Sequence, residues 1–260
     1  MKALLDVRAI DKRFGGLHAL KAVSFAVPAN TIYGVIGPNG AGKTSLFNVI
    51  TGFYPADSGD LLLDGNSIFN APAHRIVTAG VARTFQNIRL FGDMTALENV
   101  MVGCHPRTHI GALGAVLRGP RTRAEEQHIR ERARQLLTYV GIESQRHRLA
   151  KELPYGDQRR LEIARALATE PRLLALDEPA AGMNPTETVA LQALLGRIRE
   201  DGITVLLIEH DVKLVMSLCD YITVLDHGEN IANGVPADIQ RHPAVIEAYL
   251  GVVPVTEATT

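Results

Sequence analysis

Short runs of apolar residues alternate along the chain with stretches whose apolar residues recur at helical spacing. Four of these runs contain no charged residue: Ile32–Ile36, Leu173–Leu176, Thr204–Ile208 and Ile222–Leu225. Such runs are typical of parallel strands whose sheet is covered on both faces, because neither face then needs polar side chains. The alternation of strand and helix patterns therefore predicts an α/β fold.

Three earlier runs mix apolar and polar residues, namely Leu4–Ile10, Val23–Val27 and Asp60–Leu63. They predict the strands of a small antiparallel layer. A helix is predicted over Thr186–Glu200, and the three residues at its N-cap, N1 and N3 positions are Asn184, Pro185 and Glu187. These residue types start helices, so we interpret them as structural.

The segment between Gly92 and Leu153 has a helical pattern instead of strand runs. Within it, Ala124–Val140 carries apolar residues on one face and charged residues elsewhere, which predicts a surface helix with a solvated charged face. Pro106–Arg123 contains several glycines and prolines and is expected to be a loop or a flexible helix connection. These patterns predict a helical subdomain inserted into the α/β core. The tail Val252–Thr260 is expected to be frayed.

Composition narrows the class of protein. The 260 residues fit one large domain or two small ones, and 27 basic against 28 acidic residues give a net charge of −1. A nucleic-acid binder that works through bulk positive charge is therefore disfavoured. No apolar run approaches the ~20 residues that span a bilayer, and the N-terminus lacks a signal-peptide core. Cys104 and Cys219 show no metal-ligand spacing and suit a reducing compartment. We expect a soluble cytosolic protein that reaches a membrane only through a partner.

A glycine-rich segment gives the strongest chemical signal. It follows the predicted strand Ile32–Ile36, precedes a predicted helix from Lys43 onward, and matches the pattern G-x-x-x-x-G-K-[ST]. Its residues are Gly37, Pro38, Asn39, Gly40, Ala41, Gly42, Lys43 and Thr44, with Ser45 next in the helix. The glycines let backbone N–H groups point at phosphate oxygens, Lys43 adds a charge for the β- and γ-phosphates, and Thr44 offers a hydroxyl to Mg²⁺. The pattern predicts a nucleotide-binding loop.

A second signal is the apolar strand Leu173–Leu176, which ends in Asp177 and Glu178. In open α/β folds, ligands bind beyond the carboxyl ends of the strands. Asp177 is expected to hold Mg²⁺, directly or through water, and Glu178 to activate the attacking water. A strand that ends in Asp-Glu is a weak signal alone and becomes strong when it accompanies the phosphate loop.

Four further features resemble the ATP-binding-cassette (ABC) ATPases. Leu153–Arg160, which precedes a helix predicted over Leu161–Ala168, is similar to the family's signature L-S-G-G-Q. Gln86 stands at the family's Q-loop position, His210 at its switch-histidine position and Phe14 in place of the aromatic that stacks on adenine. The resemblance runs from Leu4 to about Gly251. It implies a P-loop NTPase (RecA-like) core with an antiparallel β subdomain and an inserted α-helical subdomain at about 92–165.

Several short segments resemble one subfamily, the ATP-binding subunits of branched-chain amino-acid importers. They are Phe14–Leu17, Ala82–Gln86, Arg89–Phe91, Leu161–Arg165, Glu178–Gly182 and Ala248–Gly251. The resemblance implies ATP and Mg²⁺ as ligands, a second cassette as partner, two transmembrane permeases and, indirectly, a periplasmic substrate-binding protein. It also implies a peripheral position on the cytoplasmic face of the bacterial inner membrane. The implied function is to power the import of leucine, isoleucine, valine or a related amino acid.

The resemblance implies the following roles for residues of this chain. ATP on Gly37–Thr44 of one subunit is sandwiched by the signature residues Tyr155, Gly156, Asp157 and Gln158 of the other. Gln86 and His210 join Glu178 as catalytic groups, His210 at the γ-phosphate, and Gln86 also serves as a metal ligand. Closure is transmitted through Gln86 and the helical subdomain to the membrane subunits.

The chain departs from the general family pattern at four positions. Pro154 replaces the signature serine and removes a hydroxyl and an N–H. Tyr155 replaces the first glycine, Asp157 replaces the glutamine, and Asn184 ends the inter-subunit loop in place of aspartate. These variants look typical of the importer subfamily. Gly156 and the following helix N-terminus still offer donors and a dipole to a phosphate.

Alternative interpretations remain for single residues and for the whole chain. Gln86 alone would be a solvated loop residue, His210 a capping or surface group, and Phe14 part of the core. The chain is alternatively the ATPase of another transporter, such as one for lipid or lipopolysaccharide export. A cassette ATPase of DNA repair or translation is a further alternative, although its usual tandem cassettes, zinc modules or long coiled coils are not visible.

Overall fold

The computed structural model describes residues 3–105 and 120–250, with only the backbone of residues 120–122 and 250. The chain forms two compact units, of which the first comprises the residues up to Pro72 and those from Ile198 onward. The second unit is Ala73–Arg197. Most of the predicted loop Pro106–Arg123 and the whole predicted tail Val252–Thr260 lie outside the described residues.

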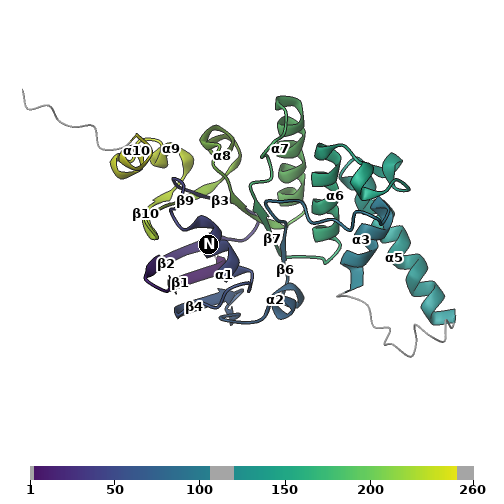
Figure 1. Cartoon of the computed structure of the whole chain (residues 1–260), viewed down its shortest axis with the longest axis horizontal. Helices are drawn as coiled ribbons and strands as arrows, with labels where there is room; N and C mark the ends of the chain where they lie inside the picture. The colour runs from purple at the N-terminus through teal and green to yellow at the C-terminus, as the bar shows by residue number, and fades with distance from the viewer. Residues whose placement is uncertain (1–2, 106–119, 251–260) are drawn as a thin grey trace, which may run out of the picture. The chain divides into compact units, whose positions relative to one another are not determined.

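An antiparallel sheet in the first unit has the strand order β2-β1-β4-β5. The strands are β1 (Ala3–Phe14), β2 (Leu17–Pro28), β4 (Ser58–Leu63) and β5 (Asn66–Ser67). Leu5 of β1 lies opposite Val27 of β2 on one side and Leu63 of β4 on the other, and all three side chains are buried. The predicted antiparallel layer is therefore present, and β1 and β2 extend beyond the predicted bounds (Figure 1).

The same unit contains strands in the order β10-β9-β3-β8. They are β3 (Ile32–Ile36), β8 (Thr204–Ile208), β9 (Tyr221–Asp226) and β10 (Glu229–Gly234). β3 is parallel to both β8 and β9, and every residue of β3 and β8 is buried, as their uncharged runs predict. β10 returns antiparallel to β9.

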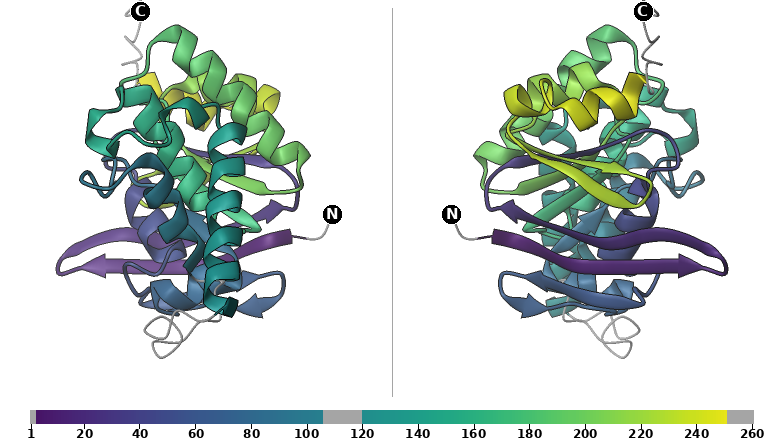
Figure 2. Two further views of the ribbon diagram at one scale, coloured as in Figure 1. Left: turned by 90° about the vertical axis from the view of Figure 1, so that its right-hand side faces the viewer. Right: turned by 90° about the vertical axis from the view of Figure 1, so that its left-hand side faces the viewer.

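Four helices accompany these strands in the described part of the first unit: α1 (Lys43–Ile50), α8 (Val212–Leu218), α9 (Pro236–Ile239) and α10 (Pro243–Leu250). α8 packs closely on β3, because a Cβ placed on Gly34 would lie 2.9 Å from Val215 Cγ1 and 3.0 Å from Cys219 Sγ. α9 and α10 lie against the β9–β10 hairpin, as the right-hand view of Figure 2 shows.

The second unit consists mainly of helices. Its two strands, β6 (Val81–Arg83) and β7 (Leu173–Asp177), are paired in parallel. Its helices are α2 (Ala73–Ala79), α3 (Ala96–Cys104), α5 (Pro120–Tyr139), α6 (Tyr155–Leu167) and α7 (Pro185–Glu200), of which α7 ends in the first unit. α3, α5 and α6 pack against one another (Figure 1). Two short 3₁₀ helices, Glu143–Gln145 and Ala150–Glu152, lie between α5 and α6.

Two helices of the second unit start at reciprocal caps. Asn184 Oδ1 accepts the N–H of Glu187 at 3.0 Å, while Glu187 Oε2 accepts the N–H of Asn184 at 2.9 Å, as the sequence predicts for the start of α7. Thr95 and Glu98 form the same arrangement at the start of α3, which the sequence analysis did not identify. Across residues 3–105 and 120–250, no helix has the length and apolar content needed to cross a bilayer.

Cys219 provides a test of packing in the first unit. Burial raises the pKa of its thiol to about 12 from an ordinary value of 9.0, so the unfolded chain releases this proton at a lower pH than the folded chain does. Stability should therefore fall as the pH rises from 9 towards 12, by at most about 1.4 kcal/mol per pH unit from this group. Urea unfolding of wild type and Cys219→Ala across this range should show the steeper loss in wild type. If the free energy of unfolding falls equally with pH in the two proteins, the burial of the thiol is contradicted.

Candidate functional site

The predicted phosphate loop lies in the first unit, between β3 and α1. The ammonium of Lys43 donates to the backbone oxygens of Gly37 at 2.8 Å and Pro38 at 2.9 Å, and only 8% of the residue is exposed. The N-cap of α1 is Gly42, and no acidic residue stands in the helix's first turn. The positive end of the helix dipole is therefore not neutralised by a carboxylate of this turn, which suits an anion.

Two glycines of the loop are required by close backbone approach. Gly37 and Gly42 have φ values of 152° and 99°, a region that side chains disfavour. A Cβ on Gly42 would lie 2.6 Å from the backbone oxygen of Ala19, and one on Gly37 would collide with the backbone oxygen of Leu225. β2 and the end of β9 thus brace the loop in one conformation.

The turn between β9 and β10 also contacts this loop. The N–H of Gly228 donates to Ala41 O at 3.1 Å, and its carbonyl accepts the N–H of Lys21 at 2.8 Å. In α10, burial raises the pKa of the Tyr249 hydroxyl, while a hydrogen bond with the Gly37 backbone acts in the opposite direction. No local sequence pattern indicates that Gly228 and Tyr249 lie at this loop.

Phe14 lies at the end of β1 and is 40% exposed, so its interpretation as a core residue is wrong. Its ring meets Tyr54 edge-on, with the centroids 5.3 Å apart, and Lys12 Nζ lies 5.3 Å from its centroid. Asp57 holds this strand end by accepting from Lys12 Nζ at 2.9 Å and from the N–H of Arg13 at 2.6 Å. The exposed aromatic ring is thus held in place and accessible to a flat ligand.

His210 follows β8, and its side chain is 58% exposed. Its Nδ1 lies 3.8 Å from Oε2 of Glu209, whose side chain is only 1% exposed. The cap of α8 is Asp211, which accepts the N–H of Leu214 at 3.1 Å. A different residue therefore performs the capping role considered for His210.

In the second unit, Asp177 ends β7 beside Arg83 of β6. Arg83 Nη2 lies 3.3 Å from Asp177 Oδ2, and both side chains are nearly buried. Burial raises the pKa of the Asp177 carboxyl, and the Arg83 guanidinium opposes this rise. A nearby cation stabilises a carboxylate that is buried away from water. The surroundings of Asp177 therefore suit its predicted role as a metal ligand.

Glu178 follows directly and contacts Gln86. The side-chain nitrogen of Gln86 donates to Glu178 Oε2 at 3.0 Å. The backbone of Glu178 has φ = 46°, an uncommon conformation outside glycine that is often found at functional positions. The structure therefore brings together two of the predicted catalytic residues of this unit.

The signature segment forms the start of a helix and not a loop before one. The predicted helix began at Leu161, whereas α6 begins at Tyr155, so Tyr155, Gly156, Asp157 and Gln158 make up its first turn. This boundary is a correction. Pro154 precedes the helix with φ = −54° and ψ = 152°, and its carbonyl accepts the N–H of Gln158 at 2.9 Å.

Gly156 lies against the side chain of Glu187, which takes part in the cap of α7. A Cβ at Gly156 would lie 2.6 Å from Oε1 of Glu187, so a larger residue would require that carboxylate to shift. The hydroxyl of Tyr155 donates to the backbone oxygen of Ala181 at 2.9 Å, within the loop that follows Glu178. Arg159 and Glu162 are two buried charged residues of α6 that contact the segment around Gln86. Both lie in segments that resemble the family, but no sequence pattern predicts their burial or these contacts.

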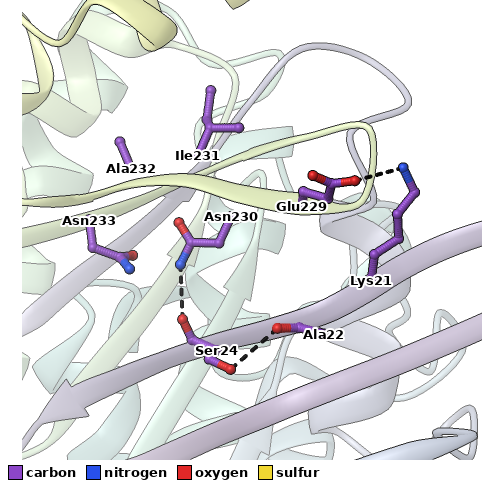
Figure 3. Close-up of a pocket in the computed structure, with 8 residues that line it drawn as sticks. All are labelled: Lys21, Ala22, Ser24, Glu229, Asn230, Ile231, Ala232 and Asn233. Carbon is purple, nitrogen blue, oxygen red and sulfur yellow. Dashed lines mark hydrogen bonds and ion pairs between the residues drawn. The ribbon is translucent and has the colours of Figure 1, made fainter.

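A pocket of about 410 Å³ in the first unit contains none of the predicted site residues (Figure 3). It lies between β2 and β10 and is lined by Lys21, Ala22, Ser24, Glu229, Asn230, Ile231, Ala232 and Asn233. Its polar groups bond to each other: Lys21 Nζ donates to Glu229 Oε1 at 2.9 Å, and Asn230 Nδ2 donates to Ser24 O at 2.9 Å. These bonds connect two strands and indicate no ligand.

Oxygen ligands for Mg²⁺ are present among the predicted residues, as the Thr44 hydroxyl, the Asp177 carboxylate and the Gln86 amide. Among the described residues, no group of three or more His, Cys, Asp or Glu side chains forms a metal cage.

Known proteins resemble this chain over most of its length. The family model for the ABC transporter matches residues 20–181, and the model for the branched-chain amino acid ATP-binding cassette transporter matches residues 229–253. The chain is 47% identical to the high-affinity branched-chain amino acid transport ATP-binding protein BraF of Pseudomonas aeruginosa, covering 96% of this chain and 98% of BraF. It is 45% identical to the protein of the same description, LivG, of Escherichia coli, covering 95% and 98%.

A more distant relative is the lipopolysaccharide export system ATP-binding protein LptB of Escherichia coli, at 31% identity over 96% of this chain and 98% of LptB. Among solved structures, a nucleotide-free ATP-binding cassette from an ABC transporter matches with a TM-score of 0.84 and 32% identity, covering 96% of this chain and all of that one. The ADP conformation of such a cassette matches with the same TM-score and identity over 97% of this chain.

Proposed function

Because this chain belongs to the ABC transporter family, an ATP-hydrolysing family, we propose that it energises the import of branched-chain amino acids or related amino acids. The observation that carries the proposal is the 47% identity to BraF over nearly the full length of both chains, together with the match of residues 229–253 to the branched-chain model. The 31% identity to LptB gives less support to lipopolysaccharide export.

Each predicted site residue has a role in this proposal. Gly37–Ser45 bind the phosphates, with Lys43 as the point charge, and Phe14 stacks on the adenine. Glu178 accepts a proton from the attacking water, Gln86 orients the carboxylate of Glu178, and His210 donates to the γ-phosphate. Mg²⁺, held by Thr44, Asp177 and Gln86, would neutralise charge on the phosphates when bound.

The proposed assembly contains two cassettes and two transmembrane permeases, with a periplasmic binding protein that delivers the cargo. The second cassette is this chain or a different one, and Tyr155–Gln158 of one cassette face the ATP of the other. The proposed location is peripheral, on the cytoplasmic face of the inner membrane. ATP stabilises the closed pair and hydrolysis releases it, because the γ-phosphate binds to both cassettes only in the closed state.

Purification of the tagged chain from solubilised membranes tests this proposal. We expect two permeases to copurify, and proteoliposomes that contain the complex to accumulate labelled leucine when ATP and the binding protein are supplied. The Glu178→Gln complex should assemble without transport and serves as the control. Copurification of lipid-export permeases, or of no membrane protein, would contradict the proposal.

The proposed adenine contact can be tested separately. Phe14→Ala should weaken ATP affinity by about 1–3 kcal/mol, the range for base–aromatic stacking, since Phe14 is the exposed ring held by Tyr54 and Lys12. Isothermal titration with Mg·ATP measures the change. Phe53→Ala removes a second exposed aromatic ring of the first unit and should leave affinity unchanged. An equal loss of ATP affinity in Phe14→Ala and Phe53→Ala would argue against stacking at Phe14.

A further inference from the structure

A buried arginine of α6, Arg159, connects separate segments of the second unit. Its side chain is 0% exposed. Nη1 donates to the backbone oxygen of Phe85 at 2.6 Å and to Glu162 Oε2 at 2.9 Å. Nη2 donates to the backbone oxygen of Gln86 at 2.9 Å and to the Tyr155 hydroxyl at 3.2 Å. Because a guanidinium is planar and its donors form a rigid fork, these four acceptors are held in one arrangement.

Glu162 fixes the same segment from its N–H side. Its side chain is 1% exposed, and Oε1 accepts the N–H of Phe85 at 3.2 Å and that of Arg89 at 3.4 Å. The Arg159–Glu162 pair therefore holds both a donor and an acceptor of the backbone at Phe85. The segment that carries Gln86 is attached to α6 through charged hydrogen bonds, which are stronger than neutral ones.

Tyr155 extends these contacts to the loop after β7. Its hydroxyl accepts from Arg159 and donates to the backbone oxygen of Ala181 at 2.9 Å. The ring also approaches Gly182, where a Cβ would lie 3.4 Å from it. A glycine at position 155, as in the usual signature, would make neither contact.

Two of these residues, Gln86 and Tyr155, contact the loop that begins at Glu178. The Gln86 side chain donates to the Glu178 carboxylate at 3.0 Å, and Tyr155 binds Ala181. Within the loop, the N–H of Ala181 donates to the backbone oxygen of Glu178 at 3.1 Å. The Glu178 carboxylate is thus linked to Arg159 by two routes, one through Gln86 and one through Tyr155.

We propose that Tyr155, Arg159 and Glu162 are positioning residues for ATP hydrolysis, which hold Gln86 and the Glu178 loop in register with each other. This inference rests on the proposed function, in which Glu178 accepts the proton of the attacking water. It assigns the Tyr155 hydroxyl to a bond within its own chain and not to the nucleotide of a partner cassette.

The energetics of burial favour a positioning role over simple stabilisation. A buried ion pair often contributes no more to stability than a well-packed apolar pair of the same size. An apolar pair, however, would supply no hydrogen bond to the carbonyls of Phe85 and Gln86. The charged pair therefore does what an apolar pair cannot, because it fixes the backbone from which the Gln86 side chain reaches Glu178.

Steady-state ATPase kinetics of Tyr155→Phe test the proposal with the smallest change. The variant keeps the ring and loses the bonds to Arg159 and Ala181, so kcat should fall by about 2–10-fold, the equivalent of one or two hydrogen bonds. The KM for ATP should stay within about twofold, because the hydroxyl that is removed bonds within its own chain and not to the nucleotide. Tyr139→Phe, which removes a hydroxyl from α5 of the same unit, is the matched control and should keep the wild-type kcat.

A double-mutant cycle shows whether Arg159 acts through Gln86. Arg159→Lys keeps the charge but loses the fork, so kcat should fall by about 10–100-fold in the wild-type background. In a Gln86→Ala background the same change should have a smaller effect, because only the route through Tyr155 then connects Arg159 with the Glu178 loop. Thermal unfolding checks that each variant is folded. If Arg159→Lys does not fold, Tyr155→Phe decides the proposal alone.

The outcomes are distinct. A wild-type kcat in Tyr155→Phe would overturn the proposal, and so would equal fold losses from Arg159→Lys in the two backgrounds. A raised KM with unchanged kcat in Tyr155→Phe would overturn it in favour of a nucleotide contact. Glu178→Gln in the same assay separates this inference from the proposed function: if that variant is inactive while Tyr155→Phe matches wild type, only the inference fails.

Discussion

Lys43→Ala is expected to abolish measurable ATP binding. The ammonium is the one side-chain cation of the phosphate loop, and at present it bonds to two loop carbonyls, of Gly37 and Pro38. Without it, the triphosphate has only backbone N–H donors and the helix dipole as partners. We expect Kd for Mg·ATP to rise by about 100-fold or more, equivalent to ~2.7 kcal/mol, in isothermal titration.

Lys21→Ala is the matched control for this variant. Lys21 also lies in the first unit, but it pairs with Glu229 at the surface, and exposed ion pairs contribute little to stability. Its loss should leave ATP affinity unchanged. An affinity of Lys43→Ala within about threefold of wild type, with the protein folded, would contradict the assignment of the loop.

Glu178→Gln is expected to bind ATP and not hydrolyse it. The amide keeps the shape of the side chain and its proximity to Gln86 but cannot accept the proton of the attacking water. We expect kcat to fall by about 10²–10⁴-fold with little change in Kd. Glu126→Gln, on the charged exposed face of α5, is the control and should retain full activity. Rapid ATP hydrolysis by Glu178→Gln would contradict the proposal that this residue accepts the proton of the attacking water.

The same variant shows which cassette serves as partner. With hydrolysis blocked, the closed pair should accumulate in Mg·ATP, and light scattering measures its mass. Pro154 offers neither the hydroxyl nor the N–H of the usual signature serine, so we expect weak homodimers and tighter pairing with a different cassette. Tight homodimers of Glu178→Gln in the absence of another cassette would contradict this preference for a different partner.

The sequence predicts best those parts of the fold whose structure is determined by a local pattern of residues. β3 and β8 have the predicted bounds, since an uncharged apolar run of only five residues favours a buried strand over a helix. The family, the fold class and the ATP-hydrolysing class predicted from the ordered motifs are confirmed by the family model and by relatives of 45–47% identity. The roles of the individual site residues stay predictions.

Other parts depend on contacts that no local pattern reveals. α6 starts at Tyr155 and not at Leu161, and the glycine at 156, which suggested a loop in the sequence, lies within its first turn beside Glu187. Arg159 and Glu162 have the sequence spacing of a surface ion pair on a helix and yet are fully buried. β10 was missed because its residues, Glu229–Gly234, are polar or small except for Ile231, and its pairing with β9 determines the strand.

The position of β3 in the chain has a consequence for biosynthesis. Both neighbours of β3, the strands β8 and β9, are encoded after residue 203, so the ribosome completes β3 long before either neighbour exists. At ~5–20 residues per second, the interval lasts roughly 10–30 s. Throughout it, the nascent chain contains an apolar five-residue strand with two unpaired edges, a type of segment prone to aggregation. Both edges of this segment therefore stay without their native partners until the last quarter of the polypeptide emerges.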